Sequence, residues 1–128
     1  MKKEELIKLI ESIKIDENEF WILSSSALVL RGIYPDAGDI DIAVTEKGLQ
    51  QLMANYTLVR KDNGWYQVTD KIECVLDTKD DWKIEKVGNY NLESIKKYYE
   101  FLLNSNREKD KLRIPLIEKY IKTNNLNI

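Results

Sequence analysis

The segment from Phe20 to Val44 reads FWILSSSALVLRGIYPDAGDIDIAV, and its pattern predicts the centre of the fold. It opens with the apolar run Phe20–Leu23, which is long enough for a buried strand. Three serines follow this run, and Ser26–Gly32 is the helix that we then expect. After a loop, Asp39–Val44 alternates acidic and apolar side chains, which is typical of a strand with one polar face.

Asp39 and Asp41 are the first candidate functional residues. Alternate residues of a strand point to the same face, so these two carboxylates project side by side. Carboxylates this close repel each other unless a positive charge lies between them, and a divalent metal is the obvious candidate. Hard oxygen ligands favour Mg²⁺ or Mn²⁺, which also bind substrate phosphates. The alternative is an exposed polar strand face.

The serines Ser24, Ser25 and Ser26 stand between the expected strand and the start of the expected helix. Backbone N–H groups at a helix start are free, and the positive end of the helix dipole lies there, so such a turn binds phosphate readily. The segment therefore predicts a phosphate cradle beside a pair of metal-binding carboxylates. In the alternative interpretation the serines only form a turn and cap the helix.

A third carboxylate is expected from the segment Lys71–Asp77, which reads KIECVLD and predicts another strand. Glu73 and Asp77 share its acidic face, and we favour Glu73 because it lies within the strand between apolar neighbours. Three carboxylates on two strands can hold two metals about 4 Å apart, an arrangement suited to in-line phosphoryl displacement. A solvated strand face is the alternative for Glu73, and Cys74 is interpreted as a core residue.

The remaining segments predict a single domain over residues 1–128 of the α/β (α+β) class, with a small mixed sheet flanked by helices. The last of these segments, Arg107–Ile121, is expected to be a helix that contains Pro115, and this proline should kink or restart it. The expected elements are a helix over Glu4–Lys14, a helix capped by Thr45, a hairpin of Tyr56–Arg60 and Trp65–Asp70 joined through Asn63-Gly64, a loop over Thr78–Tyr90 anchored by Trp82, and two C-terminal helices over Asn91–Asn104 and Arg107–Ile121.

Composition excludes several classes of protein. The net charge of -2 gives no general attraction to nucleic acid, and the absence of histidine excludes histidine triads and the usual zinc sites. One cysteine permits no intrachain disulfide, which indicates a reducing compartment. We find no apolar run of membrane-spanning length and no signal-peptide pattern, so we expect a cytoplasmic protein with no membrane partner.

Taken together, these motifs resemble a known family. Ser25-Ser26, twelve residues, and then Asp39-Ile40-Asp41-Ile42 resemble the nucleotidyltransferase signature of the DNA polymerase β superfamily. The chain is most similar to small bacterial minimal or toxin–antitoxin-related nucleotidyltransferases. Arg31-Gly32 also resembles that group, as does Arg107-Glu108-Lys109-Asp110, which is similar to the motif that opens a late helix there. The resemblance covers nearly the whole chain.

The resemblance implies transfer of a nucleoside monophosphate from an NTP, with ATP as the expected donor, to an acceptor hydroxyl, with release of pyrophosphate. Asp39 and Asp41 would bind the metals, and Glu73 would bind the metal that activates the acceptor and accept its proton. Ser24–Ser26 would hold the β- and γ-phosphates, and Lys109 would offset phosphate charge. The acceptor is left open among a small molecule, an RNA end and a protein.

Three alternatives stay open at this point. Ser25 stands where the family normally has glycine, and a serine either crowds the triphosphate or adds a hydroxyl donor. A second function class is therefore a catalytically degenerate nucleotide- or partner-binding module, for example in a toxin–antitoxin pair. Lys109-Asp110 could be a surface charge pair, or Asp110 could fix the late helix to the core. A haloacid dehalogenase-type phosphatase is disfavoured because its acids should directly follow an apolar strand.

Overall fold

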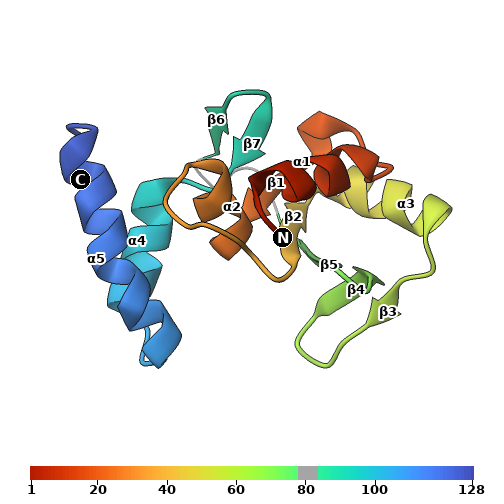
Figure 1. Cartoon of the computed structure of the whole chain (residues 1–128). Coiled ribbons are helices and arrows are strands. Elements are labelled where there is room, and N and C mark those ends of the chain that lie inside the picture. Colours follow the sequence, from red (N-terminus) through yellow and green to blue (C-terminus); the bar gives the residue numbers. More distant parts are fainter. Residues whose placement is uncertain (78–83) are drawn as a thin grey trace. The chain divides into compact units, whose positions relative to one another are not determined.

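A computed structural model describes residues 1–77 and 84–128, and the chain divides into two compact units, Met1–Glu93 and Ser94–Ile128. The first unit is mixed α/β, and the second is helical (Figure 1). The described helices are α1 (Lys3–Ser12), the 3₁₀ turn η1 (Glu17–Glu19), α2 (Ser24–Leu30), α3 (Glu46–Asn55), α4 (Ile95–Leu103) and α5 (Glu108–Thr123). The described strands are β1 (Phe20–Leu23), β2 (Ile40–Val44), β3 (Val59–Arg60), β4 (Trp65–Thr69), β5 (Ile72–Leu76), β6 (Glu85–Val87) and β7 (Tyr90–Leu92).

The strands of the described residues form one mixed sheet in the order β3-β4-β5-β2-β1-β7-β6. β2 runs antiparallel to β1 and parallel to β5, and β1 runs parallel to β7. The β3–β4 and β6–β7 hairpins lie at opposite edges of this sheet (Figure 1). The acidic strand predicted from the sequence is therefore β2, a central strand with neighbours on both sides.

Strand alternation gives the sheet two different faces. The first, which we call the helix-covered face, packs with apolar residues of α1, α2 and α3 in the main core. Its central side chains are Phe20, Ile22, Ile40, Ile42, Val44, Ile72 and Cys74. The opposite face, which we call the acidic face, carries Asp41 and Glu73 beside a smaller apolar cluster of Trp21, Leu23 and Ala43. The candidate acids thus lie on the face away from the main core.

Several local predictions are confirmed. The apolar run Phe20–Leu23 is β1, and the Asn63-Gly64 turn joins β3 to β4, with Gly64 at a φ of 86°. Thr45 caps α3, because its hydroxyl accepts a hydrogen bond of 3.1 Å from the Gly48 N–H. These features depend on residues close together in the sequence.

Two predictions in the second half of the first unit are wrong. The segment Thr78–Tyr90, expected to be mostly loop, contains the strand β6 in its described part, and Asn91 belongs to β7 instead of starting a helix. The two strands pair with Val87 opposite Tyr90, so Gly88 and Asn89 form a two-residue turn, and Gly88 has a φ of 62°. Strands of three residues with polar side chains give little periodic signal. Trp82, the expected anchor, lies outside the described residues.

The second unit is built from α4 and α5, which pack against each other. Ser94 caps α4 by accepting a hydrogen bond of 3.3 Å from the Lys97 N–H, so the helix begins later than predicted. The restart expected at Pro115 does not occur, because α5 is continuous from Glu108 to Thr123. Pro115 is exposed, so water can satisfy the carbonyl that loses its partner. Among the described residues we find no helix that is both long and apolar enough to cross a membrane.

Candidate functional site

The candidate site is a row of residues across the acidic face of the sheet. Asp41 of β2 is in register with Leu23 of β1 on one side and with Glu73 of β5 on the other. Neighbouring strands lie about 4.8 Å apart, so the backbones of Asp41 and Glu73 are adjacent. Asp39 precedes β2 by one residue and is exposed, whereas Asp41 is half-buried. The sheet therefore places two of the three predicted acids, Asp41 and Glu73, side by side on adjacent strands.

The register also distinguishes the two candidates for the third carboxylate. Glu73 pairs with Asp41, whereas Asp77 comes just after β5, where its N–H donates to the Val44 carbonyl at 2.9 Å. Asp77 lies four positions after Glu73, which corresponds to about 13 Å along the strand. Glu73 is thus the acid that lies next to Asp41.

Glu73 forms an ion pair with a lysine that the sequence did not single out. The Lys61 ammonium, which follows β3, contacts Oε1 of Glu73. Both side chains remain partly exposed, at 40% for Lys61 and 23% for Glu73. The lysine neutralises Glu73, which reduces the repulsion between this carboxylate and the adjacent Asp41.

The donor chemistry of Asp39, Asp41 and Glu73 suits Mg²⁺ or Mn²⁺, but their present arrangement does not. Within residues 1–77 and 84–128, no group of three or more acidic, cysteine or histidine side chains is placed to hold a metal ion. Glu73 is instead paired with Lys61. Metal ligation by the three acids therefore stays a prediction.

The serine turn lies directly beside Asp41, because Ser24 follows Leu23, the register partner of Asp41. α2 begins at Ser24, two residues earlier than expected, and Ser24 has a φ of 55°. This is the left-handed region, which glycine adopts without strain and serine does not. The sequence resemblance placed the glycine-like position at Ser25, whereas the backbone of this chain places it at Ser24.

Ser26 connects the turn to the loop that leads into β2. Its side chain is fully buried, and its hydroxyl donates a hydrogen bond of 2.8 Å to the backbone carbonyl of Asp39. The hydroxyl therefore holds the backbone that carries Asp39. Ser24 and Ser25 are half-buried and lie at the exposed end of α2. The phosphate-binding role expected for the three serines stays a prediction.

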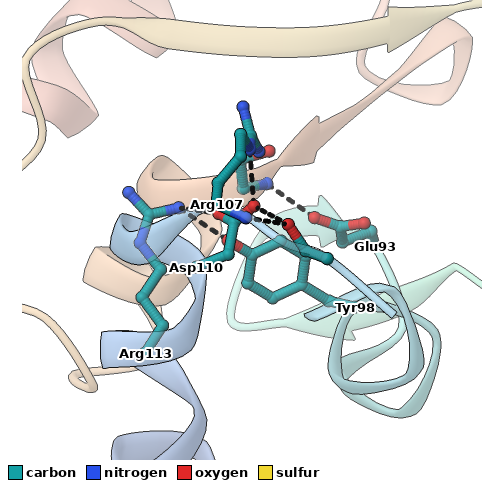
Figure 2. Close-up of polar contacts among 7 residues, drawn as sticks. Glu93, Tyr98, Arg107, Asp110 and Arg113 are labelled. Atoms are coloured by element: carbon teal, nitrogen blue, oxygen red, sulfur yellow. Dashed lines mark hydrogen bonds and ion pairs between the residues drawn. The ribbon is translucent and has the colours of Figure 1, made fainter. Parts of the chain in front are cut away.

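Glu93 supports the serine turn and was missed by sequence reasoning. Its side chain is buried, and Oε1 accepts a hydrogen bond of 2.6 Å from the Ser24 N–H (Figure 2). The Arg31 guanidinium, only 2% exposed, donates to the Glu93 carbonyl at 3.0 Å and lies 3.4 Å from the Glu85 carboxylate. Arg31 belongs to the motif quoted for the resemblance, but Glu93 lay within an expected helix. Its sequence carried no signal for this contact.

The motif Arg107-Glu108-Lys109-Asp110 lies in the second unit, and its aspartate is buried. Asp110 is fully buried and accepts hydrogen bonds of 2.6 Å from both the Ser105 hydroxyl and Nε of Arg107, with the Arg113 guanidinium at 4.0 Å (Figure 2). Burial alone would raise the pKa of Asp110, but hydrogen bonds from Ser105 and Arg107 and the two arginine charges lower it. Asp110 thus fixes the start of α5 to the preceding loop.

Lys109, predicted to offset phosphate charge, is exposed in the first turn of α5, and that role stays a prediction.

Cys74 is buried on the helix-covered face, as expected for a core residue. Burial and, to a smaller extent, the Glu73 charge raise the pKa of its thiol to about 11. The thiol is therefore protonated and unreactive at neutral pH.

Comparison with known proteins adds no family to this geometry. No protein-family model matches the chain, and no curated protein matches it.

Proposed function

We propose that this chain is a nucleotidyltransferase that transfers a nucleoside monophosphate from an NTP, with ATP as the expected donor, to an acceptor hydroxyl and releases pyrophosphate. One observation carries the proposal: Asp41 and Glu73 occupy paired positions on adjacent strands, directly beside the serine turn that begins α2. Paired carboxylates next to the start of a helix suit a metal-bound polyphosphate, although the Ser24 N–H would have to leave Glu93 before it could bind a phosphate oxygen. The motif resemblance described above supports the same reaction.

In this proposal the cofactor is Mg²⁺ or Mn²⁺, with Asp39, Asp41 and Glu73 as its ligands. Such an ion would neutralise the charge of the phosphates. Ser24 and Ser25 would contact the phosphates, and Ser26 would hold the Asp39 backbone through the hydrogen bond described above. Lys61 would have to leave Glu73 before all three acids could act as ligands.

A second candidate function is a catalytically degenerate module that binds a nucleotide or a protein partner, as in a toxin–antitoxin pair. Two observations favour it. Lys61 already neutralises Glu73, and a serine occupies the left-handed position at Ser24 where glycine would let a phosphate approach closely. Such a module would retain the fold and the turn without turnover.

The test is calorimetric titration of the purified protein with ATP and the other NTPs, with and without Mg²⁺. We expect Mg²⁺-dependent binding that disappears in the Asp39→Asn/Asp41→Asn double variant. Asp62→Asn/Asp70→Asn is the matched control, because it removes the same charge from exposed positions outside the row. Absence of NTP binding by the folded wild-type protein would overturn the proposal.

Turnover separates the two candidates. Release of pyrophosphate in the presence of an acceptor panel of small alcohols, RNA ends and hydroxyl-bearing peptides would identify the enzyme. Metal-dependent NTP binding with no pyrophosphate release from any acceptor would favour the degenerate module.

A further inference from the structure

The first unit contains a pocket that lies apart from the acidic row. It has a volume of about 370 Å³ and opens between the end of α1, η1, β1 and the β6–β7 turn. Its β1 residues are Phe20 and Ile22, which point to the helix-covered face, whereas Asp41 lies on the acidic face. Neither the three predicted acids nor the serine turn lines it. A ligand bound here would therefore occupy the other side of the sheet.

The floor of the pocket is apolar. Ile10 belongs to α1 and Ile13 directly follows that helix, whereas Phe20 and Ile22 belong to β1. Each of these four side chains is at least nine-tenths buried. Ile15 completes the apolar lining. A pocket of this volume with a hydrophobic floor falls within the range that binds small organic molecules.

The rim of the pocket is acidic and braced by hydrogen bonds. Glu11 accepts a hydrogen bond of 2.8 Å from the Tyr90 hydroxyl, and the Glu17 carbonyl accepts one of 3.1 Å from the Asn91 side chain. The Glu11 bond raises the pKa of Tyr90, which keeps that hydroxyl protonated as the donor. A carboxylate offers about four acceptor sites, so Glu11 retains capacity for a further donor.

The charge of the lining selects the ligand. Among the residues that the structure describes, two glutamates and neither a lysine nor an arginine line the pocket. We propose that this pocket binds a small organic cation, in which an ammonium or amidinium group contacts Glu11 and Glu17 and a compact apolar body covers Phe20 and the isoleucines. A nucleoside triphosphate is excluded by its negative charge, so this site is distinct from the proposed nucleotide site and does not depend on it.

The probe is 2-phenylethylamine, titrated into the ¹⁵N-labelled full chain at physiological salt and followed by amide chemical shifts. We expect saturable shifts confined to the segments around Ile13, Phe20 and Tyr90. The isosteric 3-phenylpropanoate should produce none of them, because a carboxylate replaces the ammonium. Equal binding of the anion, or absence of saturable shifts with the amine, would overturn the proposal.

Charge variants test the role of the rim. Glu11→Gln/Glu17→Gln should weaken amine binding by about tenfold through loss of two nearby charges. Glu4→Gln/Glu5→Gln removes the same net charge from exposed positions at the start of α1 that do not line the pocket, and it should leave affinity unchanged. An equal loss in both double variants would show a general charge effect and overturn the assignment to this pocket. All four positions are exposed, so these variants are expected to fold.

Discussion

Two acidic residues of this chain, Asp110 and Glu73, lie in contrasting environments. Asp110, in the second unit, is fully buried and is surrounded by a serine hydroxyl and two arginines. Glu73, in the first unit, is 23% exposed, pairs with the partly exposed Lys61 and lies next to a second carboxylate, Asp41. A buried acid held by a hydroxyl and an arginine fixes a local structure, whereas an accessible acid whose lysine partner can exchange is able to accept a ligand. The contrast separates a structural acid from a candidate functional one.

The largest expected effect tests the structural side of this contrast. Asp110→Ala should lower the free energy of unfolding of the second unit by about 3 kcal/mol, because it leaves the arginines without their shared carboxylate. Native-state hydrogen exchange of the Leu102 and Ile117 amides measures this, since both residues are buried within the second unit. Glu108→Ala, at an exposed position of the same helix turn, is the control and should cost less than about 1 kcal/mol.

Acid provides an independent check of the same residue. The folded-state pKa of Asp110 is lowered, so its stabilising effect is complete above its unfolded pKa and is lost as pH falls through the folded value. The stability difference between wild type and Asp110→Asn should be constant from neutral pH to about pH 5 and should shrink below about pH 4. A difference that persists unchanged to pH 2 would contradict the assignment of the effect to the ionised carboxylate.

Glu73, the accessible acid of this comparison, predicts a smaller effect, which is a gain in metal affinity instead of a loss of stability. Lys61→Met should increase affinity for Mn²⁺ by about fivefold, because a partly exposed ion pair contributes up to about 1 kcal/mol and the metal no longer competes with it. Calorimetry of Mn²⁺ binding measures the change without nucleotide. Lys71→Met removes the same charge from an exposed position at the start of β5 and should have little effect. Equal Mn²⁺ affinity in wild type and Lys61→Met would contradict the proposal that Glu73 is a metal ligand.

The same contrast explains how much the sequence could predict. The apolar run of β1, the alternation of β2 and the Asn63-Gly64 turn follow from residues that are neighbours in the chain, and the structure confirms them. The pairing of Asp41 with Glu73 depends on strand order, which the sequence pattern allowed but did not determine.

The partners of the site depend on distant contacts and were not predictable. Lys61 reaches Glu73 because β4 lies between β3 and β5, and a lysine in a polar hairpin loop has many possible partners. Glu93 contacts the Ser24 N–H across 69 positions of sequence. β6 and β7 are too short and too polar for a periodic signal, so the position of Glu93 after β7 was also hidden.

The smallest expected effect concerns the strain beside the acidic row. Ser24 adopts a left-handed backbone that costs a non-glycine residue about 1–2 kcal/mol, and its N–H bond to Glu93 holds it there. Ser24→Gly should therefore stabilise the first unit by about 0.5 kcal/mol, since glycine's greater unfolded-state entropy offsets part of the relief. Ser25→Gly is the matched control, because Ser25 lies within α2 without a positive φ, and glycine there should destabilise by about 0.5–1 kcal/mol. Urea unfolding monitored by tryptophan fluorescence measures both, since Trp21 and Trp65 belong to the first unit. Stabilisation by Ser25→Gly with loss of stability in Ser24→Gly would move the glycine-like position back to Ser25. Stabilisation by Ser24→Gly with loss of stability in Ser25→Gly would instead place the backbone strain at Ser24, directly after Leu23, which is the register partner of Asp41. Backbone strain is often retained at functional sites, so this result would agree with a functional role for the serine turn.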